Sequence, residues 1–369
     1  MRAWATGIWA AALILQFAIV PANAGPTLLF EPSTGKILYA EDVDDLWHPA
    51  SLTKIMTAYI AFEAIKEGKL HLDDKISCSL RATLQPPSKA GIQVGNTLTV
   101  EHALQAVIVK SANDVTVMLA EAISGSEAAF VDRMNATAKR LGMTRTHFVN
   151  TNGLPEPDLV TTARDLGKLA RAVITEYPQY ASYWSMPAMH IGKRRLGSHN
   201  ALLRTFPGAD GLKTGFTCDS GYNVIASASR DGRRLLAVVL GETSGNERAI
   251  RSASLLEYGF QNYDWKQLFN TTNLDTLPVD PSAKGITSVR DTVAAWSCRP
   301  PKQSKSGTTA RHKRRQPKAT AAKSKTAAKK GNEASESPPP VKGAEAAIAP
   351  QPQVGATAKT PKSAQAISP

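Results

Sequence analysis

Three short motifs, far apart but in a defined order, constrain the fold of this 369-residue chain more than any other feature. They are Ser51-Leu-Thr-Lys54, Ser111-Ala-Asn113 and Lys213-Thr-Gly215. Any one of them occurs often by chance, but together they supply the separate parts of one reaction, acyl transfer to a serine hydroxyl. We therefore expect a fold that brings these three segments to a single cleft.

The first motif predicts a nucleophile and its base. Ser51 and Lys54 are three residues apart, so on a helix they project from one face. A neutral Lys54 amine can take the proton of the Ser51 hydroxyl as it attacks a carbonyl. For that amine to be neutral near pH 7, burial and a nearby cation must lower its pKa, and Lys213 is the natural candidate for the cation. The alternative, a helix-capping serine with a surface lysine, is outweighed by the two other motifs.

The second motif predicts proton transfer and substrate binding. Ser111 is expected to relay the proton to the leaving amine, and the Asn113 side chain to hold the amide backbone of the substrate. Serine and asparagine are also common in turns, so Asn113 could equally cap a helix that begins at Asp114. Both interpretations can be true of Asn113.

The third motif predicts a strand at the border of the cleft. Lys213 is expected to set the electrostatics and Thr214 to bind a substrate carboxylate, while Gly215 leaves room for the substrate backbone to approach as an added strand. The backbone N–H groups of Ser51 and Phe216 are expected to form the oxyanion hole. Taken alone, this motif would be read as an ordinary lysine and glycine at a strand edge.

Apolar periodicity and turn residues predict a mixed α/β fold. We expect a hairpin over 27–31 and 36–41, and three later strands over 211–217, 222–229 and 233–240, with Asp231-Gly232 as a tight turn between the last two. Helices are expected over 51–66, 100–110, 114–123, 126–141 and 247–258. This order predicts an antiparallel sheet flanked by helices, plus a helical lobe that carries Ser111-Ala-Asn113 on a turn.

The two ends of the chain differ from its middle. Residues 1–24 are typical of a signal peptide that ends in Ala22-Asn-Ala24, with an uncleaved membrane anchor as the alternative. We assign 25–270 to a catalytic domain and 271–298 to a short C-terminal extension. A tail over 299–369, rich in Lys, Ala and Pro, is expected to be disordered because it has too little apolar area to form a core. Export to the periplasm or cell envelope follows from the signal peptide.

The formal net charge of +13 is almost entirely a property of the tail. Residues 299–369 carry 15 Lys and Arg against three Glu, so residues 25–298 are close to neutral. We therefore expect no nucleic-acid partner for the body. The tail could contact anionic envelope polymers or lipid headgroups electrostatically, or it could be a solvated linker.

The cysteines leave their pairing open. Cys78, Cys218 and Cys298 allow one disulfide plus a free thiol, or three unpaired thiols. A bond at Cys218 would lie near the site, because that residue is three positions past Gly215. No Cys/His spacing is typical of a metal site, and we expect neither a metal nor a cofactor.

The residues around the motifs carry a family resemblance. The contexts are Pro49-Ala-Ser-Leu-Thr-Lys-Ile-Met-Thr-Ala58, Lys110-Ser-Ala-Asn-Asp114 and Asp210-Gly-Leu-Lys-Thr-Gly-Phe-Thr217. They resemble the serine D-alanyl-D-alanine carboxypeptidases, the low-molecular-mass penicillin-binding proteins. The likeness extends through 142–148, 152–154 and 162–165 to about residue 260, nearly the whole catalytic body.

The resemblance implies a β-lactamase-like fold and removal of the terminal D-alanine from peptidoglycan stem peptides, with roles in cell-wall biogenesis and cell shape. It also implies covalent inhibition by penicillins and other β-lactams. By position, Arg248 resembles the family arginine that helps to hold the terminal carboxylate of the substrate. Members of the family often carry a second, β-rich domain and an amphipathic anchor, neither of which we expect after residue 260.

Three other functions share these motifs. A DD-endopeptidase that cuts peptidoglycan crosslinks uses the same chemistry and is the nearest alternative. A class A β-lactamase needs a Glu-x-x-Leu-Asn loop, and Glu156-Pro-Asp-Leu-Val160 lacks that pattern. An inactive binder of wall peptides is disfavoured because every motif side chain is intact.

Overall fold

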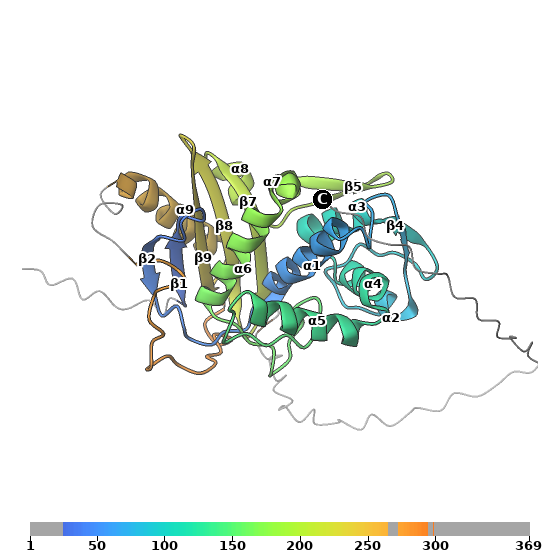
Figure 1. The fold of residues 1–369 in the computed structure, drawn as a ribbon, viewed down its shortest axis with the longest axis horizontal. Helices are drawn as coiled ribbons and strands as arrows, with labels where there is room; N and C mark the ends of the chain where they lie inside the picture. Colours follow the sequence, from blue (N-terminus) through green and yellow to red (C-terminus); the bar gives the residue numbers. More distant parts are fainter. Residues whose placement is uncertain (1–24, 265–271, 294–297, 299–369) are drawn as a thin grey trace, which may run out of the picture. The chain divides into compact units, whose positions relative to one another are not determined.

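A five-stranded antiparallel sheet forms the centre of the fold. The computed structural model describes residues 25–264, 272–293 and 298, all within one compact unit spanning 1–303, so the expected signal peptide and tail lie outside the described residues. The strand order is β2-β1-β9-β8-β7 (Figure 1). The strands are β1 (Thr27–Phe30), β2 (Ile37–Glu41), β7 (Ala209–Thr217), β8 (Gly221–Arg230) and β9 (Arg233–Glu242).

Local turn chemistry determines how the sheet strands connect. Asp231 and Gly232 both have positive φ, 50° and 74°, so β8 and β9 join through the two-residue turn that the sequence predicts. The predicted N-terminal hairpin is confirmed, with Thr27 opposite Glu41. β1 also pairs with β9, so strands from the N-terminal and C-terminal parts of the domain lie side by side in one open sheet. This order makes β7 an edge strand, whose outer row of backbone groups is open to the cleft.

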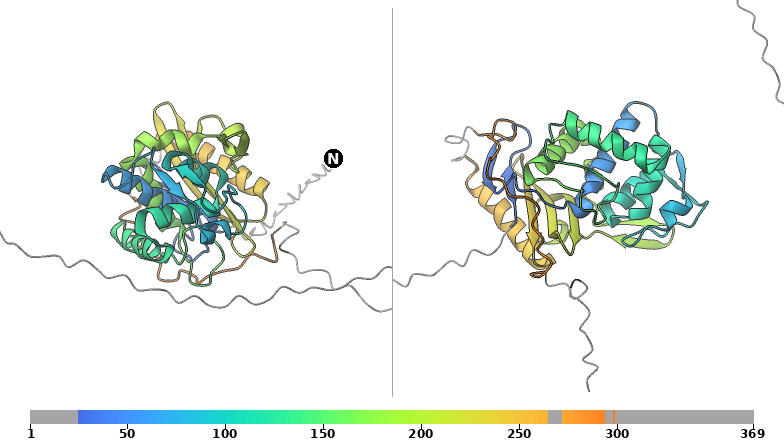
Figure 2. Two further views of the ribbon diagram at one scale, coloured as in Figure 1. Left: turned by 90° about the vertical axis from the view of Figure 1, so that its right-hand side faces the viewer. Right: turned by 90° about the horizontal axis from the view of Figure 1, so that it is seen from below.

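The sheet has a packed helix layer on each face. α9 (Gly245–Gln261) covers one face, and α6 (Ala163–Glu176) covers the other, with α1 (Lys54–Lys66) packed beside α6 (Figures 1 and 2). Alternate residues of β9 serve the two layers, as a strand requires. Leu235 and Val239 belong to the core under α9, whereas Leu236 and Val238 belong to the larger core around α1. The mixed α/β fold expected from the sequence is confirmed.

Ser51 lies on a 3₁₀ turn rather than on the first turn of an α-helix. The sequence predicts one helix from 51 to 66, but the structure has a 3₁₀ helix over Ala50–Thr53 and begins α1 at Lys54. The physical reason is the backbone of Ala50, whose φ of 49° turns the chain sharply just before Ser51. Nearly every position of α1 is buried, as its all-round apolar sequence predicts.

The predicted helical lobe is present, with a break at the second motif. Its helices are α2 (Leu80–Thr83), α3 (Val100–Gln105), the π-helical turn η2 (Ala106–Lys110), α4 (Asn113–Ser124) and α5 (Glu127–Arg140). The break comes at Ser111, which has left-handed backbone geometry. The capping prediction for Asn113 is wrong. Asn113 is the first residue of α4, and its side chain donates to the carbonyl of Pro86 instead.

Short elements complete the described part of the fold. They are β3 (Lys75–Ser77), β4 (Thr97–Thr99), η3 (Pro178–Tyr180), α7 (Ala181–Ser185), β5 (Ala188–Ile191), β6 (Arg194–Gly197) and α8 (Leu202–Thr205). The β5–β6 hairpin packs on η2 and so spans from the sheet to the helical lobe. No helix among the described residues is long and apolar enough to cross a membrane.

Hydrogen bonds hold the described part of the C-terminal extension against the body. Arg164 forms a buried ion pair with Asp44 (2.6 and 2.7 Å) and also donates to the carbonyls of Leu277 and Pro278. Burial alone would raise the pKa of Asp44, but hydrogen bonds from Arg164 and Asp280 outweigh it, and the pKa is lowered.

The structure also decides the cysteine pairing that the sequence left open. Cys218 and Cys298 form a disulfide across 80 residues, and Cys78 is a buried free thiol. The bond joins the end of the extension to the β7–β8 connection. Val289 strengthens this attachment, because its N–H donates to the carbonyl of Asp219.

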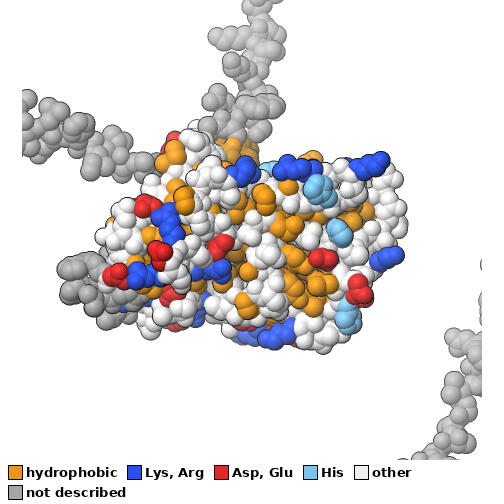
Figure 3. Space-filling model, turned by 90° about the horizontal axis from the view of Figure 1, so that it is seen from above, with side chains coloured by type: hydrophobic (Ala, Val, Ile, Leu, Met, Phe, Trp, Pro, Cys, Tyr) orange, Lys and Arg blue, Asp and Glu red, His pale blue; other side chains and the backbone are white. Residues whose placement is uncertain are grey.

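On the face seen in Figure 3, basic side chains are interspersed with acidic and hydrophobic ones. This mixture of charges agrees with the nearly neutral net charge of residues 25–298.

Candidate active site

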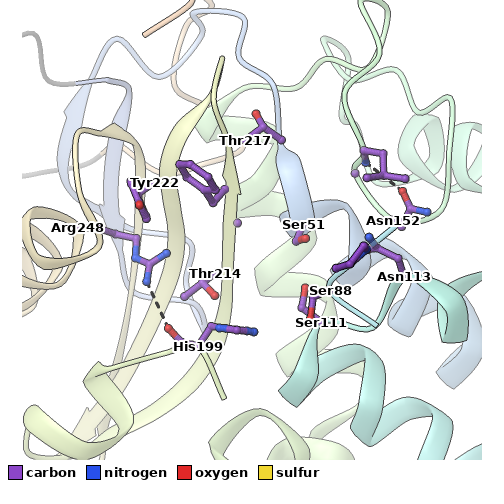
Figure 4. Close-up of a pocket in the computed structure, with 15 residues that line it drawn as sticks. Ser51, Ser88, Ser111, Asn113, Asn152, His199, Thr214, Thr217, Tyr222 and Arg248 are labelled. Atoms are coloured by element: carbon purple, nitrogen blue, oxygen red, sulfur yellow. Dashed lines mark hydrogen bonds between the residues drawn. The ribbon is translucent and has the colours of Figure 1, made fainter. Parts of the chain in front are cut away.

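All three motifs meet at one cavity of about 390 Å³ between β7 and the helical lobe (Figure 4). Two of the residues singled out from the sequence, Lys54 and Lys213, are buried beside this cavity rather than in its lining. The other singled-out residues all line it: Ser51, Ser111, Asn113, Thr214, Gly215, Phe216 and Arg248. The fold therefore brings segments that are up to about 200 residues apart to one place.

The amine of Lys54 lies directly against the hydroxyl of Ser51. Its Nζ is 3.0 Å from Ser51 Oγ, and it also donates to the backbone carbonyl of Asn152. A 3₁₀ turn aligns residues three apart, so the local backbone itself makes this contact. Burial and then the charge of Lys213 hold the pKa of Lys54 well below its usual 10.5, against a weaker opposing effect of Asp114. The site thus favours the neutral amine that proton abstraction needs.

Lys213 gives the wall of the cavity its positive charge. The side chain is 2% exposed, and its Nζ donates to the carbonyl of Thr214 (3.0 Å). Burial and then the charge of Arg248 lower the pKa of Lys213 to about 7. An incoming anion would relieve this repulsion between cations, so the wall is suited to a carboxylate.

Ser111 supplies an unused buried hydroxyl. Its backbone is left-handed, with a φ of 61°, which directs the residue out of the helical path and into the cavity. Within the described ranges, Ser111 Oγ is buried without a hydrogen-bond partner. A buried polar atom without a partner costs stability, so its retention indicates that a ligand or a transferred proton engages it.

Asn113 is anchored on the side of the helical lobe. Its side-chain nitrogen donates to Pro86 O (2.9 Å), and its backbone N–H donates to Ser88 O (2.7 Å). The side chain is therefore preoriented, and its amide oxygen is the atom suited to accept an N–H from a substrate.

Gly215 lies where β7 packs closely against the turn that carries Ser51. A Cβ at this position would lie 3.0 Å from Pro49 O and 3.1 Å from Ser51 N. The missing side chain therefore lets β7 approach the turn that carries Ser51. The expectation that it also leaves room for a substrate backbone stays a prediction, and Gly215 does line the cavity.

This close approach also positions the expected oxyanion hole. The N–H of Thr217 points toward the β7–β8 connection, where it donates to Ser220 Oγ (3.1 Å). Successive N–H groups of a strand point to opposite edges, so the N–H of Phe216 points to the open edge, on the side of Ser51. Two backbone donors, from Phe216 and Ser51, are thus available to one carbonyl oxygen of a ligand.

Arg248 is a buried cation without an acidic partner. It extends from α9 and makes long hydrogen bonds to the carbonyls of Asn223 (3.4 Å) and His199 (3.3 Å). No carboxylate in the described part of the chain pairs with it, whereas Arg164, elsewhere in the fold, has Asp44. Burial lowers the pKa of Arg248 to about 10, so it stays charged at neutral pH. It is ready to bind an anion.

Asn152 and His199 were missed by sequence reasoning as parts of the site. Asn152 binds Lys54, and the next residue, Gly153, has a φ of +85° and passes directly over Ala50 O. The Asn-Gly pair was the available signal. His199 contacts the backbone of Lys110 and has a pKa lowered to about 4, by burial and then by Lys213, so it is neutral at pH 7. No pattern in the sequence pointed to His199.

Comparison with known proteins agrees with this geometry. A family model described as D-alanyl-D-alanine carboxypeptidase matches residues 18–244. The chain belongs to the D-alanyl-D-alanine carboxypeptidase family. Its sequence is 34% identical over 252 residues to the D-alanyl-D-alanine carboxypeptidase DacF of Bacillus subtilis, covering 67% of this chain and 64% of that protein. It is 34% identical over 272 residues to DacC of Escherichia coli, covering 72% of this chain and 66% of that protein. The chain thus spans just under two thirds of these relatives.

Solved structures of family members share the fold. The D-alanyl-D-alanine carboxypeptidase DacD from Francisella tularensis has a TM-score of 0.63 at 32% identity, covering 68% of this chain and 74% of that one. Penicillin-binding protein D2 from Listeria monocytogenes, solved in a cefotaxime-bound form, has a TM-score of 0.59 at 34% identity. That match covers 64% of this chain and 97% of the Listeria chain.

Proposed function

We propose that this protein is a serine D-alanyl-D-alanine carboxypeptidase that removes the terminal D-alanine from peptidoglycan stem pentapeptides. The observation that carries the proposal is the contact between Lys54 Nζ and Ser51 Oγ (3.0 Å) on the wall of a cavity that also holds the unpaired Ser111 hydroxyl. Family membership and the names of the relatives support the same activity.

Substrate binding follows from the charges and donors of the cavity. The terminal carboxylate of the peptide lies against Thr214 and the Arg248 guanidinium. The carbonyl oxygen of the scissile bond accepts from the N–H groups of Ser51 and Phe216, which stabilise the negative charge that develops on it. The side-chain oxygen of Asn113 accepts an N–H of the peptide backbone.

Acylation then proceeds by general-base catalysis. Ser51 Oγ attacks the carbonyl carbon while neutral Lys54 takes the hydroxyl proton. Ser111 donates its proton to the nitrogen of the terminal D-alanine and is reprotonated by the Lys54 ammonium, the C–N bond breaks, and free D-alanine leaves. Water then attacks the ester on Ser51 and gives a proton to neutral Lys54. The ester C–O bond breaks, Lys54 returns the proton to Ser51 Oγ, and the shortened peptide leaves.

The same nucleophile is proposed to react with β-lactams. These compounds present a strained amide and a carboxylate, and so occupy the groups that hold the peptide. A relative solved in a cefotaxime-bound form supports this proposal. Glu156 does not line the cavity that contains Ser51, and its loop lacks the Glu-x-x-Leu-Asn pattern of a class A β-lactamase, so we do not propose that activity.

We also propose that the enzyme acts in the cell envelope. The support is the sequence of residues 1–24, together with the location of its substrate, the wall peptide. The basic segment 299–369 is proposed to hold the enzyme to anionic envelope polymers by charge attraction.

The decisive experiment offers the purified enzyme a stem pentapeptide and a crosslinked dimer, with mass spectrometry of the products. Loss of one alanine from the pentapeptide is expected. Cleavage of the dimer without alanine release would instead indicate an endopeptidase.

Replacement of the nucleophile tests the mechanism. Ser51→Ala is expected to abolish both D-alanine release and covalent labelling by a fluorescent penicillin. Retained labelling by this variant would show that Ser51 is not the nucleophile.

A further inference from the structure

A second cavity, of about 280 Å³, adjoins the active-site cavity. The two share Gly153, Leu154 and Thr217 in their linings. The loop that includes Glu156 forms part of the lining of the second cavity, and Asp219 also lines it. No lysine or arginine is part of that lining. Its chemistry is therefore opposite to that of the cationic end around Arg248.

The direction of the bound substrate places this cavity on the acyl side of the scissile bond. Along β7, Thr214 holds the terminal carboxylate and Phe216 the scissile carbonyl, so the rest of the peptide extends past Thr217. In Figure 4, Thr217 lies above and Thr214 below the level of Ser51, both on β7. Extended backbone rises about 3.3 Å per residue, so the residue before the D-alanyl-D-alanine pair reaches the level of the second cavity.

Glu156 carries the negative charge in the second cavity that is not already compensated by a cation. Asp219 is already paired with Arg290, at 3.0 Å from Nε and 2.7 Å from Nη2, and it accepts from Ser288 as well. The remaining titratable group, His48, is held through Nδ1 by the carbonyl of Leu159 (2.8 Å). By contrast, no cation in the described part of the chain pairs with Glu156.

Glu156 lies in a loop whose backbone has little conformational freedom. Pro155 and Pro157 flank Glu156 and fix their own φ angles, which lowers the conformational entropy that binding would remove. The N–H of Leu159 donates to Glu156 O (3.1 Å) and closes the turn. The carboxylate is exposed, so a ligand can reach it.

We propose that this cavity is a subsite for a positively charged side chain in the residue that precedes D-alanyl-D-alanine, with Glu156 as the residue that selects it. The ligand class is a peptide whose third residue carries a free side-chain ammonium, as lysine and diamino acids do. This subsite rests on the proposed carboxypeptidase function and adds its preference for the acyl part of the substrate.

Two tripeptides that differ only in charge test the subsite. One is Nα-acetyl-lysyl-D-alanyl-D-alanine with a free ε-amine, and the other is acetylated on that amine. The wild-type enzyme is expected to release D-alanine from the free-amine peptide with a kcat/KM about two- to fivefold higher, the size of an ion pair open to solvent. This preference is expected to fall with increasing salt.

Glu156→Gln is expected to make the two peptides equal by lowering kcat/KM for the free-amine peptide alone. Asp158→Asn is the matched control, because Asp158 is an exposed carboxylate on the same loop that does not line the cavity. The control is expected to keep the wild-type preference.

The contrary outcomes separate the two proposals. Release of D-alanine from both peptides at equal kcat/KM by the wild-type enzyme, or a preference that survives in Glu156→Gln, would overturn the subsite alone. Release from neither peptide would overturn the carboxypeptidase function, and the subsite with it.

Discussion

At the scale of single residues, the site is defined by lysines that are costly to bury as cations. Lys54 and Lys213 are almost inaccessible to water, and each has a lowered pKa. Burial disfavours the charged form of an amine, and a neighbouring cation disfavours it further. The same effect makes Lys54 a base near neutral pH and leaves Lys213 and Arg248 in need of an anion. The positive charges of the site therefore have no compensating negative charge until a carboxylate binds.

The pH dependence of kcat/KM is expected to reflect the titration of both Lys54 and Lys213. As pH rises, Lys54, whose pKa is held well below its usual value, loses its proton and kcat/KM for D-alanine release increases. Above about pH 7, where Lys213 loses its charge, attraction for the substrate carboxylate weakens and kcat/KM falls. The two limbs belong to a coupled pair of groups.

A histidine variant is the control for this profile. His199→Gln is expected to leave both limbs in place, because the pKa of His199, about 4, keeps it neutral throughout this range. Rates measured from pH 5 to 10 check both statements. A kcat/KM that rises continuously to pH 10 would contradict the role given to Lys213.

At the scale of elements, the site depends on how closely an edge strand approaches a 3₁₀ turn. The N–H of Phe216 and that of Ser51 come from different elements, and they can serve one oxygen only while β7 packs against the turn over Ala50–Thr53. Gly215 permits that packing, because any Cβ there meets backbone atoms of Pro49 and Ser51. Catalytic geometry here is a property of two elements in contact.

Gly215→Ala is expected to slow acylation by a penicillin at least about tenfold, since a shift of a few tenths of an ångström to 1 Å misaligns the oxyanion hole. A loss of about 1–3 kcal/mol in the free energy of unfolding should accompany it, as for other overpacked sites. Stopped-flow labelling and thermal unfolding measure the two effects. Gly197→Ala on β6 is the control, because nothing lies within 4 Å of its added Cβ, and acylation by that variant should match the wild type.

At the scale of the whole molecule, contacts of the extension tie the two ends of the domain together. Arg164 pairs with Asp44 and donates to the carbonyls of Leu277 and Pro278, and a disulfide joins Cys218 to Cys298. These contacts hold the described part of the extension, residues 272–293 and Cys298, against the body. The disulfide is attached two residues after Phe216, at the end of the strand that borders the site. Stability and site geometry are therefore linked through this connection.

Removal of the disulfide is expected to destabilise the protein. Cys298→Ser should lower the free energy of unfolding by about 2–4 kcal/mol, because the bond closes a loop of roughly 80 residues. Denaturant unfolding with and without reductant tests this. Reductant should bring the wild type to the level of the variant and leave the variant unchanged, and a wild type insensitive to reductant at every denaturant concentration would contradict the expectation.

Deletion of residues 299–369 tests the proposed tether. The truncated enzyme should lose salt-sensitive binding to isolated envelopes while it keeps its rate on a soluble pentapeptide. Equal retention of the two forms at every salt concentration would rule the tether out.

Local patterns explain why so much was predictable. The hairpins, the helices and the residues of the three motifs follow from periodicity, turn chemistry and reactive side chains, each of which acts over a few neighbouring positions. The class of chemistry at Ser51 could be predicted in the same way, because Lys54 is three residues away and the local turn brings its amine to the Ser51 hydroxyl. The neighbourhood of each motif then carried the family resemblance.

Only the tertiary structure decided the long-range contacts, and those complete the site. Four features depend on segments that are distant in sequence. They are the position of His199 in the site, the Cys218–Cys298 disulfide, the close approach of Gly215 to the Ser51 turn, and the second cavity beside Glu156. Such contacts arise when elements pack, and no short pattern encodes them. The sequence determined which groups react, and the packing of β7 against the Ser51 turn decided where a substrate can lie.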